Sequence, residues 1–411
     1  MHAWIRRILV VLSLLALLFF AYLTAIPLAY SMLYFAVLLI VVSWLWTRLG
    51  SSSLSIRRDA PKGAYEVGEE FIELLEVQNR APIALPWVEV SDGAGIPGYN
   101  AGRAVSIRRR GSRKWRTHGR FSSRGRYRMG PTRLVTGDPF GFFQRHFEVG
   151  PDSSVTVYPR LVDVSRFLPG ASHSAGETIA LGRFADAPPD AFGVRDYDPS
   201  DGFNRIHWPS TARLGRPMVK SFEKYEGTDL TVVLDLMNGV HFGWPPVSTL
   251  EYAVSLAASV AVAGLRRNQS VGLVCNDAAR SHISAGSGDL QLRRILDFLA
   301  EADANGSSGL APLLDGLAAS RGQQSVVVIT PRAAGQWIDR LARAARGGSR
   351  KNTILHLEAH SFGGPAPAAN VDALSLGEQL TWWSLGAGDE IFRRRRKAAR
   401  MAGEEPVPIA I

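Results

Sequence analysis

The sequence predicts two N-terminal transmembrane helices, a β-sandwich-like domain and a doubly wound α/β domain. Three patterns support this: a long uncharged apolar run, then short β-type runs between turn residues, then apolar strands alternating with helices. The 411 residues are 46% hydrophobic and 20% charged, which is typical of folded protein. We expect a membrane hairpin, the β-rich domain, a linker, the α/β domain and a basic tail, at residues 1–50, 55–165, 166–228, 229–386 and 387–411.

The N-terminal apolar run is long enough for two membrane crossings. No Asp, Glu, Lys, Arg or His occurs from Ile8 to Thr47, and about 20 helical residues already cross the hydrocarbon core. Pro27 cannot donate a helical hydrogen bond and disfavours helix at Ile26. We therefore expect spans at about 8–25 and 28–46, joined by a tight turn.

Basic residues flank the pair of spans on one side only. The connecting turn carries none, so the positive-inside rule places both ends and the soluble domains in the cytoplasm, beneath a multi-pass inner-membrane anchor. A cleaved signal peptide is the alternative, but Leu23 stands where a small residue is needed and a second apolar run follows. The flanking basic residues are Arg6, Arg7, Arg48, Arg57, Arg58 and Lys62.

Catalytic and cofactor motifs are absent from the sequence. There is no Walker A loop, G-x-S-x-G or H-E-x-x-H pattern. Cys275 is the only cysteine, which excludes an intramolecular disulfide and a cysteine metal cluster. We interpret Cys275 as a small core residue and expect no cofactor.

The positive charge is concentrated in one segment. No acidic residue occurs from Gly93 to Gly137, and twelve Lys or Arg lie between Arg103 and Arg133, so the net charge of +10 leaves −2 for the rest. Three interpretations stay open: a solvated strand face, a surface for anionic lipid headgroups, and a surface for an acidic partner protein. Nucleic acid is disfavoured because no binding motif is present. The candidate basic surface is Arg108, Arg109, Arg110, Arg113, Lys114 and Arg116.

Short β-type runs fill residues 55–165. "EEFIELLEVQN", "LPWVEVSD" and "SSVTVYP" are strand-like, and residues 126–129 alternate polar with apolar. Their spacing predicts an antiparallel β-sandwich.

From Leu230 strands alternate with helices. "LTVVLDL", "SVGLVCN", "QSVVVIT" and "NTILHLE" are predicted strands, and a helix is expected after Ser248 as N-cap. We interpret Ser284–Gly288 as loop. Because ligands in such sheets bind at the carboxyl ends of strands, Asp235 and Thr330 are the residues placed where a site would lie.

The linker holds the densest cluster of polar side chains, from Arg195 to Glu226. An Asp beside a His can form an acid–base pair, as Asp201 and His207 would. No nucleophile or metal set accompanies them. A salt-bridged connection between domains, or a docking surface for a partner, fits these residue types better.

Two blocks carry a family resemblance. "RGRYRMGPTRLVTGDPFGFF" (Arg124–Phe143) and "GVRDYDPSDGFNRIHWPSTARLGRPMVKSFE" (Gly193–Glu223) resemble the domain-of-unknown-function-58 family. The resemblance implies two spans, a β-rich domain and a von Willebrand factor type A-like domain. It also implies a MoxR-type AAA+ ATPase as partner. The signature positions that it assigns to docking or to inter-domain contact are Arg195, Tyr197, Asp201, Arg205, His207, Trp208 and Arg213.

One departure concerns a metal. A metal-binding type A domain carries D-x-S-x-S after its first strand, whereas Asp235 here precedes Leu236, Met237, Asn238 and Gly239. Met is a poor ligand for a hard cation. Asp235 is thus a degenerate candidate, and we expect no metal.

The leading hypothesis is a non-enzymatic, membrane-anchored scaffold or adaptor that partners a cytoplasmic MoxR-type AAA+ ATPase. The alternative is a cell-envelope enzyme that uses Asp201 and His207 as an acid–base pair. The tail "RRRRKAAR" (Arg393–Arg400) is either a solvated helix end or a contact with anionic lipid headgroups.

Overall fold

The protein is described by a computed structural model. It describes residues 2–51, 53–149, 153–168, 193–196, 208–221, 229–319, 324–333, 335–346, 352–366 and 380–392. The described residues form two compact units, one within residues 1–160 and one within residues 161–392. Each unit is described by itself.

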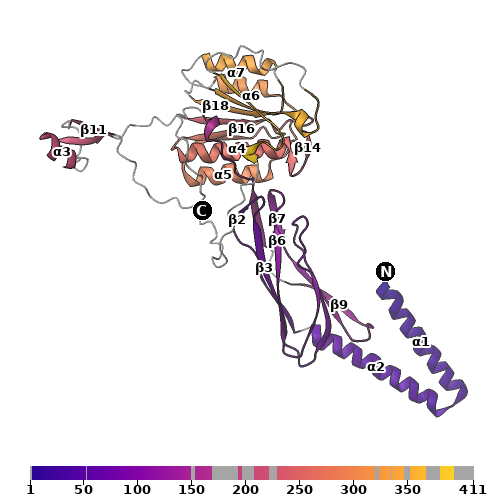
Figure 1. Ribbon diagram of the computed structural model, residues 1–411. Helices are drawn as coiled ribbons and strands as arrows, with labels where there is room; N and C mark the ends of the chain where they lie inside the picture. The colour runs from indigo at the N-terminus through magenta and orange to yellow at the C-terminus, as the bar shows by residue number, and fades with distance from the viewer. Residues whose placement is uncertain are drawn as a thin grey trace. The chain divides into compact units, whose positions relative to one another are not determined.

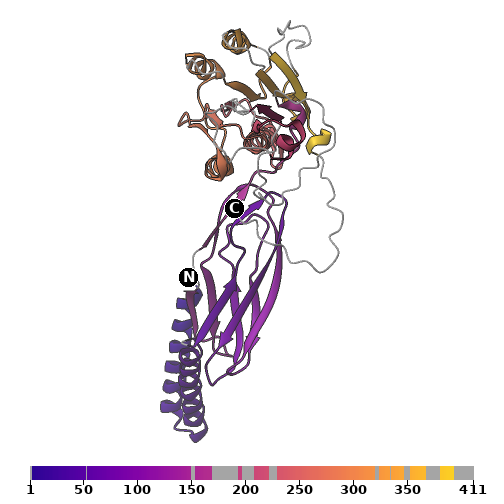
Figure 2. The same ribbon diagram turned by 90° about the vertical axis from the view of Figure 1, so that its left-hand side faces the viewer.

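Two apolar helices open the first unit and lie side by side (Figure 2). α1 runs from His2 to Thr24 and α2 from Pro27 to Ser51. Pro27 is the first residue of α2, where its missing N–H costs nothing, so the predicted break is confirmed. Helix α2 is long and apolar enough to cross a membrane, whereas the apolar part of α1, Ile8–Thr24, is shorter. Helix α2 also continues past the expected end at residue 46.

Ten strands follow, in three sheets ordered β1-β3-β6, β2-β10-β7 and β5-β4-β8-β9 (Figure 1). Strand β3 alternates buried and exposed residues along its whole length, as a strand with one covered face must. The strands are β1 Leu54–Asp59, β2 Ala64–Glu66, β3 Glu70–Asn79, β4 Leu85–Ser91, β5 Arg103–Ile107, β6 Ser112–Arg120, β7 Gly125–Met129, β8 Thr132–Gly137, β9 Gln144–Val149 and β10 Ser153–Tyr158.

The sheet β1-β3-β6 supplies one side of two apolar cores. Leu75 and Trp115 pack with Val88 and Leu134 from the four-stranded sheet, and Phe71 packs with residues of β7 and β10. The predicted β-rich domain is therefore present. Its pairing is antiparallel except that β2 and β10 run parallel.

The described part of the linker contains a short hairpin. β11 (Gly193–Asp196) pairs antiparallel with β12 (Met218–Ser221), and α3 (Trp208–Leu214) lies between them in sequence. The hydroxyl of Thr211 accepts a hydrogen bond from the backbone N–H of Met218 at 2.9 Å, which connects α3 to β12. The short helix η1 (Ser165–Phe167) precedes this segment.

The second unit contains a six-stranded sheet ordered β17-β16-β13-β18-β19-β20. Its strands are parallel except for the antiparallel edge strand β17. In chain order this is 3-2-1-4-5-6, a doubly wound arrangement. The strands are β13 Leu230–Leu234, β16 Val271–Cys275, β17 His282–Gly286, β18 Ser325–Thr330, β19 Asn352–Leu357 and β20 Leu380–Leu385; β14 Gly243–Trp244 and β15 Val247–Ser248 form a separate hairpin.

Helices cover both faces of this sheet (Figure 1). α4 (Thr249–Arg266) and α5 (Gly288–Glu301) contact each other on one face. α6 (Leu310–Ala319) and α7 (Gln336–Arg346) pack on the other, against Val233 and Val328. Ser248 is the N-cap of α4, as predicted, and accepts a hydrogen bond from Glu251 N. Two short helices, η3 (Ala359–Phe362) and η5 (Glu390–Phe392), complete the described unit.

Three elements of this domain differ from expectation. Residues 284–286, interpreted as loop, belong to β17, where edge pairing with β16 organises a Ser- and Gly-containing segment. Helix α6 was not predicted because it contains Pro312 and Gly316, although Pro is tolerated in a first turn. Strand β20 was also not predicted; it pairs with β19 at the sheet edge.

Candidate functional site

Four polar side chains line the edge of the six-stranded sheet at which its parallel strands end. Asn276 follows β16, Asp235 follows β13, Thr330 ends β18 and His356 lies near the end of β19. None is more than 5% exposed. The predicted position of Asp235 and Thr330 at this edge is confirmed.

Asp235 is the centre of this group. Its Oδ1 accepts from Asn276 Nδ2 at 2.8 Å and from Met237 N at 3.3 Å, and its Oδ2 accepts from Thr330 Oγ1 at 2.7 Å. The backbone carbonyl of Asp235 contacts His241 Nε2 at 2.9 Å. The carboxylate is therefore held by three neighbouring segments of the chain.

Arg332 brings a cationic group to the same carboxylate. Its Nε lies 3.1 Å from Asp235 Oδ2, and its guanidinium also contacts the sulfur of Met237. The Arg332 Nε hydrogen is not directed at that oxygen, so the contact is an ion pair rather than a well-aligned hydrogen bond. The sequence analysis missed Arg332; its one signal is its place two residues after Thr330.

Backbone hydrogen bonds connect the segment after Asp235 to Gly306. Gly306 accepts from Asn238 N and donates to the carbonyl of Leu236, at 2.8 and 2.9 Å. A Cβ at position 306 would lie 1.8 Å from the Asn276 carbonyl oxygen, so only glycine fits. Asn276 completes the contact by accepting from Leu236 N at 2.5 Å and donating to the Ser308 carbonyl at 2.8 Å.

The donor set does not suit a divalent cation. The Arg332 guanidinium already neutralises Asp235, and Met237 offers a soft sulfur where a hard cation needs oxygen. Within the described ranges, no group of three or more His, Cys, Asp or Glu is placed to hold a metal ion. The geometry therefore favours a structural role for Asp235.

His356 is the titratable neighbour of this group. Burial, with a smaller contribution from His360, lowers the pKa of His356 to about 4, against an opposing hydrogen bond to the backbone of Pro331. Its ring lies 5.1 Å from that of Trp382, between centroids. His356 is therefore neutral at physiological pH.

The signature residues are only partly described. Tyr197, Asp201, Arg205 and His207 lie outside the described residues, so the proposed acid–base pair is not placed. The backbone of Arg195 pairs with Val219 across the β11–β12 hairpin. Trp208 begins α3 with 66% of its surface exposed, and Arg213 is also exposed on α3.

The candidate basic surface lies on the β domain. All six of its side chains are exposed, around the β5–β6 turn and along β6. Lys114 pairs with Glu76 on the adjacent β3, at 3.3 Å. Such an exposed pair contributes little to stability.

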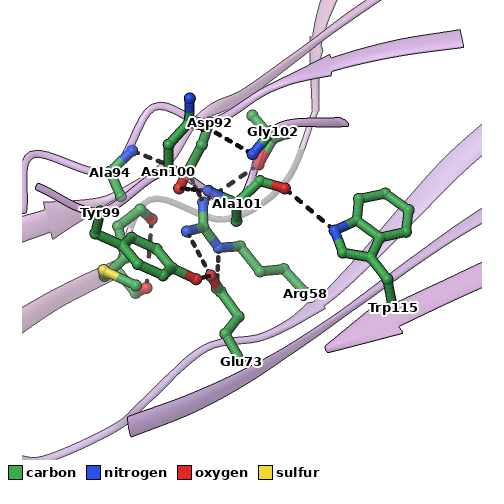
Figure 3. Close-up of polar contacts among 12 residues, drawn as sticks. Arg58, Glu73, Asp92, Ala94, Tyr99, Asn100, Ala101, Gly102 and Trp115 are labelled. Carbon is green, nitrogen blue, oxygen red and sulfur yellow. Dashed lines mark hydrogen bonds and ion pairs between the residues drawn. The ribbon is translucent and has the colours of Figure 1, made fainter. Parts of the chain in front are cut away.

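A buried polar cluster inside the β domain was not foreseen (Figure 3). Arg58 forms ion pairs with Glu73 and, at 2.9 Å, with Asp92, and all three side chains are at most 4% exposed. The hydroxyl of Tyr99 donates to Glu73. Burial and this hydrogen bond raise the pKa of Tyr99 well above its usual value.

The cluster corrects one part of the orientation argument. Burial, the largest influence, opposes the charge on Arg58, but Glu73 and Asp92 together outweigh it and raise the pKa of Arg58. Because Arg58 is neutralised within the fold, it is not a free flanking charge. The exposed Arg57 and Arg48 remain on that side of α2.

Comparison with known proteins supports the family resemblance. Residues 193–360 match the family described as "Protein of unknown function DUF58". The "Uncharacterized protein YeaD" of Bacillus subtilis (strain 168) is 26% identical over 241 residues, 57% of this chain. The match also spans 57% of that relative's length.

Solved structures add little. The solution structure of the CARDB domain of PF1109 from Pyrococcus furiosus is 16% identical, with a TM-score of 0.20, over 26% of this chain and 94% of that domain. Its crystal structure in complex with di-metal ions is 15% identical, with a TM-score of 0.19, over 25% of this chain and 91% of that chain. Similarity this low carries no argument.

Proposed function

We propose that this chain is a non-enzymatic, membrane-anchored scaffold that docks a cytoplasmic MoxR-type AAA+ ATPase. The observation that carries the proposal is that the polar side chains at the carboxyl ends of the parallel strands are bonded to one another and to Arg332. Asp235 is fully buried and engaged by Asn276, Thr330 and Arg332. At the sheet edge where α/β proteins place ligands, these side chains fix the fold instead of facing a substrate.

The anchor in this proposal consists of both apolar helices. Helix α2 is a candidate span by length and composition, and α1 packs beside it. In this proposal both helices cross the membrane with the basic flanks inside, so the soluble units lie in the cytoplasm with the ATPase partner.

The α/β unit is assigned a von Willebrand factor type A-like fold in this proposal. Its doubly wound sheet supports the assignment, together with the family resemblance of residues 193–223. A fold of this class serves many functions, so the partner is inferred from the resemblance and from the exposed signature residues.

Trp208 and Arg213 are the described residues best suited to docking. Both are exposed on α3, and Trp and Arg dominate the binding energy of protein interfaces. Trp208 is 66% exposed, so most of its indole surface is not covered by the residues that the structure describes and is open to a partner.

Quantitative crosslinking in native membranes tests the proposal. We expect an AAA+ ATPase to crosslink to the parent chain and to be lost from the variant Trp208→Ala. Trp244→Ala is the matched control, since Trp244 is 86% exposed on the β14–β15 hairpin, outside the signature. Recovery of no ATPase with the parent chain would refute the proposal.

A further inference from the structure

The turn between β8 and β9 carries aromatic side chains to the surface of helix α2. Pro139 and Phe140 border a cavity of about 320 Å³ whose other wall is α2, from Phe35 to Trp46. Phe140 is 59% exposed, and its ring lies 6.2 Å from that of Phe142, between centroids. An aromatic turn therefore lies beside the helix that is the best candidate to enter a bilayer.

Four backbone N–H groups of this turn are hydrogen-bonded within it. The buried Asp138 carboxylate accepts from the N–H groups of Phe140, Phe142 and Phe143, at 2.9, 3.3 and 2.6 Å. The Asp138 carbonyl accepts from Gly141 N at 3.3 Å. An unbonded backbone donor is costly beside a bilayer, and these four N–H groups are bonded within the turn.

Two polar atoms in the cavity wall have no partner within the described chain. Ser43 Oγ and Trp46 Nε1 are both buried without a hydrogen bond, and Ser43 is 1% exposed. Because both atoms are covered, the surface that the cavity presents is almost entirely apolar. Such a lining suits an acyl chain of a glycerophospholipid rather than its headgroup.

Arginine residues also lie at the end of the β domain that carries the β8–β9 turn. Arg80 N donates to Ser53 O, and Arg110 N donates to Ala81 O, at 2.9 and 3.1 Å. Gly50, near the end of α2, lies directly against Leu85 at the start of β4. The β5–β6 turn with the exposed Arg108, Arg109 and Arg110 is thus at the end of the domain that α2 leads into.

We propose that this end of the β domain is a phospholipid-docking face. The turn 138–143 enters the bilayer beside α2, the cavity between them holds a glycerophospholipid, and the turn 108–110 binds anionic headgroups. Phenylalanine side chains bury at the boundary between lipid headgroups and acyl chains, and basic residues near this boundary gain from anionic lipid. This inference rests on the placement of α2 in the bilayer, which the proposed function also uses.

Site-specific fluorescence tests the face in the full-length chain. The variant Phe140→Cys, labelled with an environment-sensitive dye, is reconstituted into vesicles of phosphatidylcholine with phosphatidylglycerol. Cys275 is buried, and burial raises its thiol pKa, so the introduced cysteine is the reactive one. Matched controls are Ser122→Cys, an exposed residue just past the opposite end of β6, and Val41→Cys on the exposed surface of α2.

We expect lipids with spin labels on their acyl chains to quench the dye at position 140 severalfold more than the dye at position 122. Iodide, a water-soluble quencher, should quench the dye at position 122 more than the dye at position 140. Replacing Arg108, Arg109 and Arg110 together by Gln should abolish the increase in quenching at 140 that phosphatidylglycerol causes. Quenching at 41 but not at 140 would overturn the docking face and leave the anchor standing. No lipid quenching at 41 would overturn both.

Discussion

Arg332 contacts the carboxylate of Asp235, with Nε 3.1 Å from Oδ2, at the sheet edge where α/β domains bind ligands. Asp235 is fully buried and the Arg332 side chain is 26% exposed. The pair connects the end of β13 to the segment after β18. The positive charge beside the Asp235 carboxylate is therefore supplied by a side chain of the protein, Arg332.

Removal of the Arg332 guanidinium should destabilise the α/β domain. Arg332→Ala leaves a buried carboxylate without its cation, which costs roughly 2 kcal/mol after allowing for the partial exposure of Arg332. Urea unfolding followed by tryptophan fluorescence measures the loss. Arg340→Ala, which removes the more exposed pair with Asp315, is the matched control and should cost under about 1 kcal/mol. Equal losses in both variants, or stabilisation of the parent chain by added Mg²⁺, would contradict this role for Asp235.

His356 should make the α/β domain sensitive to acid. Its folded pKa of about 4 lies below the ordinary histidine value of 6.5, so the unfolded state binds the proton first and stability falls as pH drops from about 6.5 to 4. The full effect is about 3 kcal/mol. His356→Gln should flatten the pH dependence of the unfolding midpoint across this window, whereas His360→Gln, at a more exposed site, should not. An unchanged profile for His356→Gln would refute the assignment.

The cluster around Glu73 should be essential to the β domain. Glu73→Ala leaves the buried Arg58 with Asp92 as its remaining carboxylate partner and removes the acceptor of Tyr99, at a cost of about 3 kcal/mol. Glu76→Ala on the same strand removes only the exposed pair with Lys114 and should cost under about 1 kcal/mol. Thermal unfolding of the two variants distinguishes these outcomes. Similar midpoints would show that the cluster is dispensable.

The proposed orientation has a direct readout. Green fluorescent protein fused after Phe392 should fluoresce, because it matures in the cytoplasm. Alkaline phosphatase fused at the same position should be inactive, because it needs an oxidising compartment. The same fusions after Ala25, in the turn between α1 and α2, should give the opposite result. Active phosphatase after Phe392 would reverse the topology.

The sequence was most informative where a local pattern determines structure. The proline at 27 marks the helix break, Ser248 caps α4, and the runs before Asp235 and at Thr330 form adjacent parallel strands. Hydrophobic periodicity and helix capping are local signals, so they can be recognised in the sequence without knowledge of the tertiary fold.

The missed features depend on contacts between distant residues. Arg58 and Glu73 are 15 positions apart, and Arg332 and Asp235 are 97 apart in number. No short-range pattern distinguishes these arginines from solvated ones. Residues 284–286 are likewise strand because β16 lies beside them, which their own composition does not indicate. The Asp201 and His207 pair lies outside the described residues and stays a prediction.

The most direct test of the scaffold proposal is a binding measurement with purified components. The full-length chain in lipid nanodiscs is immobilised, and the purified MoxR-type ATPase from the same organism is passed over it. We predict saturable binding by the parent chain and by Trp244→Ala, and a loss of at least about tenfold in affinity for Trp208→Ala, with unfolding midpoints unchanged. The absence of binding by the parent chain, or equal affinity of Trp208→Ala, would contradict the proposed docking role.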